Sequence, residues 1–164
     1  MNPQLKITSS INPNDIHKVM SIVATFGANA ENIIKIRDYI KNELKELADN
    51  RILYLLEDIE PVAMVQLILK NADNRPELAN GKEIAHIHAL QVSKTHHRQG
   101  YGLKLMQLLE LEAIARGVKT LTLGVDSDNE KALNLYKKLN YSLMKTLEGR
   151  TPEVQLHYLQ KRLN

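Results

Sequence analysis

Apolar residues in the first half of the chain recur at two kinds of spacing. Short runs that alternate with polar residues or continue unbroken predict β-strands, whereas a spacing of three and four residues predicts amphipathic helices. Residues 71–82 are polar and include Pro76 and Gly81, which favours a loop. In this half we expect strands over 5–11, 52–56 and 62–69. The first has Ile11 as its last apolar residue before Asn12-Pro13, and the other two form a hairpin. We expect helices over 14–27 and 33–47, and Asp49-Asn50 ends the second helix.

The second half of the chain alternates between predicted strands and predicted helices. We expect strands over 84–92, 120–125, 143–147 and 156–163, with a turn at 149–152 before the last strand, and helices over 100–116 and 128–139. The first of these helices stops at Gly117, and its predicted inner face consists of Leu105, Leu108, Leu109 and Ala113.

The order of these elements is β-α-α-β-β-β-α-β-α-β-β. This order predicts an α/β fold in which helices pack on a mixed β-sheet. The sequence contains no internal repeat, low-complexity tract or linker, and its 164 residues are enough to bury a core. We therefore expect residues 1–164 to form a single domain.

Composition narrows the classes of function. The chain has no cysteine, which excludes disulfides, thiolate metal ligands and a cysteine nucleophile. Its net charge of +3 is spread among acidic residues, so a nucleic-acid partner is not expected. Residues 1–10 lack the pattern of a signal peptide, and apolar runs such as Leu67-Ile68-Leu69 are too short to span a bilayer. We expect a cytoplasmic protein without a membrane partner.

A glycine pair marks the junction between a predicted strand and the helix that follows it. Gly100 and Gly102 let the backbone approach a ligand without hindrance from a Cβ atom. The first amides of the helix have no partner within the helix and favour an anion such as a diphosphate. His96, His97 and Arg98 add donors at the rim. The glycine pair alone is also compatible with a plain turn.

Two other phosphate-binding motifs are absent from the sequence. The dinucleotide fingerprint Gly-x-Gly-x-x-Gly fails because residue 105 is leucine and no suitably spaced acidic residue follows a strand. A P-loop is excluded because the chain contains no Gly-Lys-Ser/Thr. A small nucleotide-binding protein of another kind is therefore disfavoured.

A second motif opens the helix predicted over 128–139. Ser127 and Glu130 have the spacing of a capping box. Asn140 follows the last apolar position and suits a left-handed C-terminal cap. The buried face of this helix is predicted to consist of Ala132, Leu135, Tyr136 and Leu139.

Together the two motifs resemble those of the GNAT superfamily of N-acetyltransferases. The acyl-CoA-binding signature of that family is Arg/Gln-x-x-Gly-x-Gly/Ala, and this chain has His97 at the lead position before its glycine pair. The second family pattern is Asn-x-x-Ala-x-x-Leu-Tyr-x-x-x-Gly-Phe/Tyr, which residues 129–141 match except that Asn140 replaces the glycine. The resemblance is close over residues 84–141 and architectural elsewhere.

The resemblance implies a central mixed sheet of about seven strands flanked by about four helices. It also implies acetyl-CoA as co-substrate, an amine as acceptor, and Tyr136 as the group that protonates the departing thiolate. Helix periodicity alone explains Tyr136 equally well as a core residue. The residues expected to contact the cofactor are Leu90, Gln91, Val92, His97, Arg98, Gln99, Gly100, Tyr101, Gly102, Leu103, Asn129 and Tyr136.

The motifs leave the general base open. Many relatives carry Glu where this chain has His86, and strand alternation places His86 and His88 on one face with Leu90 and Val92. A histidine near its ordinary pKa is a suitable base, so we expect His86 or His88 in this role, with Glu83 as a third candidate. Both histidines are also explained as hydrogen-bonded strand residues. A metal site is not expected, because no acidic residue is spaced with His-x-His.

The acceptor is the least defined part of the site. In the family it is held by the first two helices, the loop before the central strand and the last hairpin, here residues 14–48, 71–82 and 148–155. These segments carry both signs of charge, so they do not distinguish an amino acid, aminoglycoside, polyamine or protein amine. A non-catalytic acyl-CoA sensor is the alternative to an enzyme, and a homodimer through an edge strand or the last hairpin fits either. The charged residues concerned are Glu31, Arg37, Asp38, Asp73, Arg75, Glu77, Glu148 and Arg150.

Overall fold

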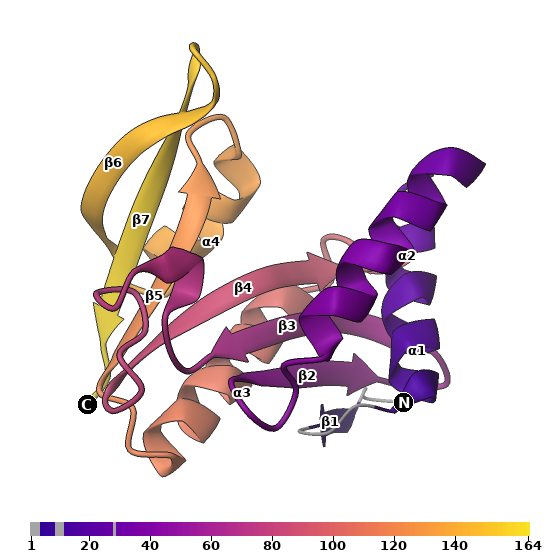
Figure 1. Ribbon diagram of the computed structural model, residues 1–164, viewed down its shortest axis with the longest axis horizontal. Coiled ribbons are helices and arrows are strands. Elements are labelled where there is room, and N and C mark those ends of the chain that lie inside the picture. Colours follow the sequence, from indigo (N-terminus) through magenta and orange to yellow (C-terminus); the bar gives the residue numbers. More distant parts are fainter. Residues whose placement is uncertain (1–3, 9–11, 28) are drawn as a thin grey trace. The chain divides into compact units, whose positions relative to one another are not determined.

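The computed structural model describes residues 4–8, 12–27 and 29–164 (Figure 1). Ile11, which the sequence places in the first strand, lies outside these residues. The strands are β1 (Gln4–Thr8), β2 (Arg51–Glu57), β3 (Pro61–Ile68), β4 (Ile84–Val92), β5 (Thr120–Asp126), β6 (Ser142–Thr151) and β7 (Val154–Arg162). The helices are α1 (Pro13–Ala24), α2 (Ala30–Leu44), α3 (Tyr101–Ala115) and α4 (Glu130–Lys138), with short 3-10 helices η1 (Ala72–Asn74) and η2 (Lys94–His96).

The described strands form one mixed sheet of seven strands in the order β1-β2-β3-β4-β5-β7-β6. Strands β4 and β5 run parallel, with Ile84 opposite Thr120 and Ile87 opposite Leu123. Strand β7 runs antiparallel to both β5 and β6, and β1 runs antiparallel to β2. The predicted order of elements and the α/β class with a mixed sheet are therefore confirmed.

Contacts divide the chain into two compact units, which are described separately. Unit 1 comprises Met1–Leu67 and Ala89–Met106, and unit 2 comprises Ile68–His88 and Gln107–Asn164. Strand β4 and helix α3 each contribute residues to both units. The expectation of a single domain stays a prediction.

The core of unit 1 lies between helices α1 and α2 and strands β2 and β3. Apolar residues recur every three or four positions along both helices, so one face of each helix packs on the strands. Asn12 caps α1 and Asn29 caps α2 through their side-chain oxygens. The core residues are Val19, Ile22, Val23, Ile40, Leu44, Leu47, Leu53, Leu55 and Met64.

Helix α2 ends earlier than the apolar stripe predicted. Its last residue is Leu44, and Leu47, although buried, lies beyond the helix in a bridge to Arg51. The apolar pattern continues to Leu47 because this residue packs in the same core. The next residue, Ala48, has a left-handed φ of 71°, which turns the chain. Periodicity records burial and therefore placed the end of the helix too late.

The core of unit 2 includes part of the loop between β3 and β4. Leu78 and Ala79 of this loop are fully buried and pack with Ile68 and Tyr158. Partly buried residues of β6 and β7 lie against the same cluster, namely Met144, Leu147 and Leu156. Figure 1 shows β6 and β7 beside β5, in agreement with the strand order. The loop is therefore part of the core of its unit.

Helix α3 is apolar on more than one face, which blurred the prediction of its inner side. Its fully buried residues include Leu105, Leu109 and Ala113 as expected, and also Met106. Leu108 is half-buried and is therefore less enclosed than the other three predicted residues. Within the described residues, no helix combines the length and apolar character needed to cross a membrane.

The structure corrects the predicted cap of α4 and the predicted turn of the last hairpin. The N-cap of α4 is Asn129, whose Oδ1 accepts from the Ala132 N–H at 3.2 Å, so the capping box at Ser127 was wrong. Ser127 instead accepts from the Gln155 N–H through its Oγ at 3.0 Å. The last hairpin turns after Thr151, so residues 149–151 belong to β6 and not to the turn.

Candidate active site

The glycine turn of unit 1 joins β4 to α3. Arg98 and Gly100 both adopt left-handed backbone conformations, with φ of 61° and 81°. The Gly100 carbonyl accepts from the Lys104 N–H at 3.0 Å, so Gly100 stands at the N-cap position of α3. The amides of residues 101–103 therefore precede the hydrogen-bond ladder of the helix. Such a helix end favours an anionic group.

His97 holds this turn in place through its side chain. Its Nε2 lies 3.0 Å from the Val92 carbonyl oxygen, and because a carbonyl can only accept, Nε2 carries the proton. The imidazole also packs against the Phe26 ring, with 5.8 Å between the ring centroids. The residue that departs from the family signature thus ties the loop to the end of β4 and to the segment after α1.

A second contact joins the same two segments of unit 1. The Lys94 N–H donates to Thr25 Oγ1 at 2.9 Å, and that hydroxyl donates to the Ile22 carbonyl at 2.6 Å. The Ser93 N–H donates to the Val62 carbonyl at 2.8 Å. The start of the turn is therefore anchored on both α1 and β3. The sequence carried no signal for these partners, which lie far apart along the chain.

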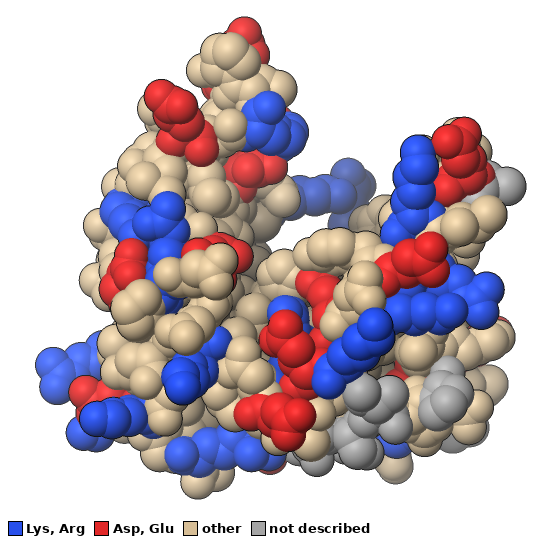
Figure 2. Space-filling view, viewed as in Figure 1, with Lys and Arg blue, Asp and Glu red and all other residues tan. Residues whose placement is uncertain are grey.

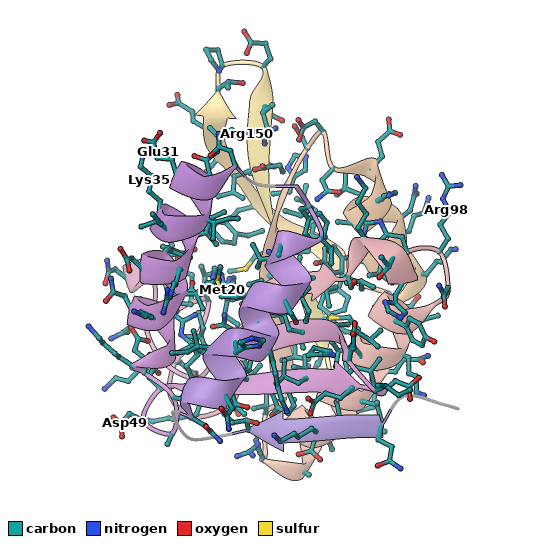
Figure 3. All side chains as sticks on the ribbon, turned by 90° about the vertical axis from the view of Figure 1, so that its right-hand side faces the viewer. Met20, Glu31, Lys35, Asp49, Arg98 and Arg150 are labelled. Carbon is teal, nitrogen blue, oxygen red and sulfur yellow. The ribbon has the colours of Figure 1, made fainter. Side chains whose placement is uncertain are left out.

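The other predicted cofactor residues of unit 1 differ in exposure. Arg98 and Gln99 are exposed, and Figure 3 shows the Arg98 side chain extending away from the loop. Gln99 Nε2 donates to the Thr95 carbonyl at 3.4 Å. Leu90, Gln91 and Val92 are half-buried. The Gln91 Oε1 atom is buried and has no hydrogen-bond partner among the described residues, so it is a candidate acceptor for a bound ligand.

Strand β4 is irregular near its middle. Ala89 has a φ of 53°, a left-handed conformation that a non-glycine residue rarely adopts in a strand. The alternation of side chains therefore does not run unbroken from His88 to Leu90. The prediction that His86, His88, Leu90 and Val92 share one face is corrected by this residue. The sequence lacked a cue, because alanine does not favour this conformation.

His86 is a buried residue of unit 2, with 3% of its surface exposed. Its Nδ1 lies 2.8 Å from Thr122 Oγ1, and the Thr122 hydroxyl donates to the Leu78 carbonyl at 2.7 Å. The two residues are register partners on the parallel strands β4 and β5. The His86 ring also lies 6.2 Å from the Tyr158 ring. Sequence reasoning singled out His86 but missed Thr122.

The other two base candidates have different surroundings. His88 is half-buried. Glu83 is half-exposed and pairs with Lys119, with 2.8 Å between Oε2 and Nζ. The hydrogen bond and charge of Lys119 lower the pKa of the Glu83 carboxyl, which makes it a weaker base. The surroundings of Glu83 therefore favour a structural ion pair at the start of β4.

Tyr136 faces the interior of unit 2 from helix α4. Only 6% of its surface is exposed, and burial raises the pKa of its phenol to about 12. Its ring contacts that of Tyr141, at 5.8 Å between centroids, and burial raises the pKa of Tyr141 as well. Tyr136 is thus neutral at ordinary pH and able to donate a proton. The predicted buried position is confirmed, and its role stays a prediction.

The last hairpin of unit 2 is fastened to the loop between β5 and α4. Arg150 Nη1 donates to the Asp126 carboxylate. Arg150 Nη2 donates to Asp128 Oδ2 at 2.6 Å. The Ser127 N–H donates to the Gln155 carbonyl at 2.8 Å. A cavity of about 690 Å³ is lined by residues of this hairpin, among them Glu148 and Arg150. The resemblance placed Arg150 at the acceptor site, but its two carboxylate partners were not predicted.

The loop before β4 is held by polar contacts within unit 2. The Tyr158 hydroxyl donates to Asp73 Oδ2 at 2.7 Å. Burial is the larger cause and this hydrogen bond the smaller cause that together raise the pKa of Tyr158 to about 12. Glu77 pairs with Lys145 at 2.6 Å, which lowers the pKa of the Glu77 carboxyl. Asn80 Oδ1 accepts from three consecutive amides, those of residues 82–84. Two of the predicted acceptor residues, Asp73 and Glu77, are therefore committed to holding the loop.

Charges on the visible surface are mixed. Figure 2 shows Lys and Arg interspersed with Asp and Glu over the face turned to the viewer. No group of three His, Asp or Glu side chains within the described part of the chain is arranged to hold a metal ion.

Comparison with solved structures places the fold in a well-populated class. A GNAT-family protein from Desulfovibrio desulfuricans superposes with a TM-score of 0.77 at 12% identity, covering 98% of this chain and all of that one. The ribosomal-protein-S18-alanine N-acetyltransferase of Escherichia coli gives 0.72 at 18% identity, covering 98% and 94% of the two chains. An aminoglycoside 6'-N-acetyltransferase complexed with coenzyme A gives 0.73 at 17% identity, covering 98% and 97%. At these identities the likeness defines the fold.

The family is defined by the sequence itself. The profile of the acetyltransferase (GNAT) family matches residues 19–141, which is most of the chain and includes both the glycine turn and Tyr136. The protein belongs to the GNAT acetyltransferase family, and its class is that of the acyltransferases. The resemblance drawn from the two motifs is therefore confirmed.

Proposed function

We propose that the protein transfers an acetyl group directly from acetyl-CoA to a primary amine. The observation that carries the proposal is the left-handed turn at Gly100, which leads into the amide end of α3 in a chain of the GNAT family. Within this family fold, the turn supplies backbone donors for the diphosphate of the co-substrate. The amine acceptor is inferred from the chemistry of the family and from the proton-handling groups in unit 2.

The turn leaves open space for a bound diphosphate. A Cβ placed on Gly100 would meet no atom within 4 Å, so the space beside the turn is open. We assign the diphosphate to the amides of residues 101–103, and Arg98 is an exposed cation of the same loop. The backbone at residues 90–92 would hold the pantetheine arm. The buried Gln91 Oε1 could then accept from an amide of that arm.

Acetyl-CoA, when bound, would supply the acyl group as a reactive thioester. Because a thiolate leaves readily, much of the rate can come from holding the two substrates in place. Tyr136 is proposed to give its phenolic proton to the departing sulfur. With a pKa raised by burial to about 12, the Tyr136 phenol is protonated at ordinary pH and therefore carries the proton that this role requires. Asn129 is proposed to contact the co-substrate in addition to capping α4.

His86 is proposed as the general base that accepts the proton of the amine. Its ring is fixed by a hydrogen bond to Thr122, whereas the alternative base Glu83 is engaged by Lys119. His88 is the second candidate on the same strand. A pH–rate profile of His86→Ala that kept the acidic limb of the wild type would remove His86 from this role.

The test of the activity is an assay with acetyl-CoA and a panel of amines. Free thiol and acetylated product are measured together, with an amino acid, an aminoglycoside, a polyamine and a peptide amine as acceptors. Thiol release that depends on an amine supports the proposal. Tight binding of acetyl-CoA without transfer to any class of amine would contradict it and indicate an acyl-CoA sensor.

The two glycines that flank α3 provide a matched pair of substitutions for testing the binding of acetyl-CoA. Gly100 and Gly117 flank the helix, have the same φ of 81°, and would each place a Cβ in open space. Alanine at either position carries the same backbone strain. Gly100→Ala should weaken acetyl-CoA binding in a calorimetric titration, and Gly117→Ala should not. Equal effects of both substitutions would contradict a binding role for the turn.

The proposal extends to the setting of the enzyme. We propose that the 164 residues act as one catalytic domain in the cytoplasm, without nucleic-acid or membrane partners, and as a homodimer. The mild net charge of +3 and its even spread support the absence of a nucleic-acid partner. Sedimentation of the purified protein would test the dimer.

A further inference from the structure

Three groups of unit 2 form a buried chain of hydrogen bonds. His86 Nδ1 lies 2.8 Å from Thr122 Oγ1, and Thr122 Oγ1 lies 2.7 Å from the Leu78 carbonyl oxygen. His86 and Thr122 are 3% and 1% exposed, and Leu78 is fully buried. Water therefore does not compete for these bonds in the folded unit, and each group depends on its protein partners.

The number of protons available to these three groups determines the direction of each hydrogen bond. A threonine hydroxyl has one proton, and a carbonyl can only accept, so the Thr122 proton points to the Leu78 oxygen. Thr122 must then accept from His86, which places a proton on His86 Nδ1. In the neutral imidazole only one nitrogen is protonated, so the lone pair of His86 lies on Nε2.

We propose that Thr122 is a positioning residue that holds His86 as the Nδ1–H tautomer and so makes Nε2 the basic atom of the site. This inference rests on the proposed function, in which His86 is the base. As the bond between the amine nitrogen and the acyl carbon forms, the carbon–sulfur bond breaks. The amine proton passes to His86 Nε2, and the sulfur takes a proton from Tyr136. Proton exchange with solvent then restores both side chains.

The same hydroxyl joins the base to the loop before β4. Leu78 lies in that loop, which the Tyr158–Asp73 bond also holds, and this loop is a proposed wall of the acceptor site. Loss of the Thr122 hydroxyl would leave both the Leu78 carbonyl and His86 Nδ1 without their partner. Thr122 thus links the tautomer of the base to the position of the acceptor wall.

The chain contains a second histidine–threonine pair that serves as a control. His157 Nδ1 lies 3.0 Å from Thr146 Oγ1 on the last hairpin, at an exposed position. Either group can donate in this contact, and water can serve as partner to both. The geometry of the contact alone therefore leaves the tautomer of His157 undetermined.

The experiment reads the tautomer directly. Protein labelled with ¹⁵N-histidine is studied by long-range ¹H–¹⁵N correlation at a pH where the ring is neutral, and His86 is assigned from the signals missing in His86→Gln. The wild type should show a protonated Nδ1 and an unprotonated Nε2. Thr122→Val should give a mixture of tautomers, Thr122→Ser should restore the wild-type pattern, and Thr146→Val should leave His86 unchanged.

Turnover of the same variants tests the link to catalysis. Thr122→Val should lower kcat about 10- to 100-fold, by analogy with the loss of a partner that orients a metal-bound histidine. The KM for acetyl-CoA should stay unchanged, and Thr122→Ser should recover most of kcat. Thermal unfolding of each variant shows whether the fold is retained, and Thr122→Ser provides the folded comparison if Thr122→Val unfolds.

Several outcomes would overturn the inference. A protonated Nε2 in wild-type His86 would contradict the assignment whatever the activity. An unchanged tautomer and kcat in a folded Thr122→Val variant would show that the hydroxyl positions nothing. Absence of acetyl transfer to every amine would instead overturn the proposed function and with it the role of His86 as base. The NMR measurement would still decide the tautomer in that case.

Discussion

Tyr136 and Tyr141 are two buried tyrosines in ring contact, and only the first is the residue that we propose as the proton donor. Both have a raised pKa because burial disfavours the phenolate. Burial alone therefore does not identify a proton donor, and the position along α4 makes the distinction. The pair offers two substitutions of equal size at neighbouring sites.

Tyr136→Phe should lower kcat by roughly 10²-fold or more, the usual scale of general acid catalysis, because phenylalanine cannot protonate the leaving thiolate. Acetyl-CoA affinity should be retained, since the ring remains. Steady-state kinetics and calorimetry measure the two quantities. Tyr141→Phe is the control and should keep kcat. Unchanged turnover in Tyr136→Phe would remove Tyr136 as the donor.

The pH dependence of kcat follows from the same residue. A general acid works while protonated, and burial raises the Tyr136 pKa from 10 to about 12. The raised pKa extends the active range upward, so loss of the donor is expected only as the pH passes through about 12. In a kcat–pH profile, the wild type should show no decline below pH 10 that is due to Tyr136, that is, no decline that disappears in Tyr136→Phe. Such a decline would mean that the phenol titrates normally.

Helix α4 shows how a tertiary contact redirects a local motif at the scale of one element. Ser127 and Glu130 have capping-box spacing, but Ser127 Oγ accepts from Gln155 on β7. Asn129, two residues later, caps the helix through Oδ1. A hydroxyl can serve only a limited number of donors, and the hairpin has taken this one. The first turn of α4 is therefore shifted along the chain.

Amide exchange should separate the two contacts. Asn129→Ala removes the cap, so we expect faster exchange of the Ala132 amide and a loss of about 1 kcal/mol in the free energy of unfolding. Ser127→Ala should instead speed exchange of the Gln155 amide and leave that of Ala132 protected. Hydrogen exchange followed by NMR measures both. Faster exchange at Ala132 in Ser127→Ala would restore the capping box.

At the scale of the whole molecule, the described chain combines a seven-stranded sheet with two compact units that share β4 and α3. In unit 1 a buried polar network joins α2, β2 and β3. Arg51 Nη1 donates to Gln66 Oε1 at 2.8 Å, and Gln66 Nε2 donates to Glu43 Oε2 at 3.0 Å. Arg51 also lies 3.6 Å from Glu46. The network fixes the end of α2 against the sheet.

Glu43→Ala should lower the free energy of unfolding by about 3 kcal/mol, because it leaves a buried guanidinium with reduced compensation. The control is Glu31→Ala on the same helix, where the Glu31–Lys35 pair is 80% and 72% exposed and points outward in Figure 3. Exposed pairs contribute little, so this change should be barely measurable. Urea unfolding compares the two variants. Equal losses would show that the buried network is not important for stability.

Most of the fold could be predicted from local pattern. Strand β4 was predicted with both of its ends, and the left-handed conformations of Gly100 and Asn140 follow from the residue types present. The end of α2 was missed because Leu47 stays buried after the helix stops. The extent of β6 was missed because the glycine at 149 lies inside a strand, where a Cβ would come within 2.1 Å of the Val154 carbonyl oxygen.

The site could be predicted only in outline. The glycine turn and the burial of Tyr136 followed from spacing, whereas the left-handed Ala89 in β4 had no cue in its residue type. The role of His97 as an anchor for Val92 was missed, since the family signature pointed to a ligand contact.

The sequence by itself determined the order of the elements, the glycine turn before α3 and the family, because periodicity and glycine conformation depend on residues close along the chain. Only the tertiary structure decided which polar groups meet. His86 and Thr122 are 36 residues apart, and Thr122 and Leu78 are 44 apart. The pairing of β5, β6 and β7 brings Arg150 to Asp126 and Asp128. Hydrogen-bond partners at such separations are brought together by the packing of the elements, so residue spacing along the chain does not predict them.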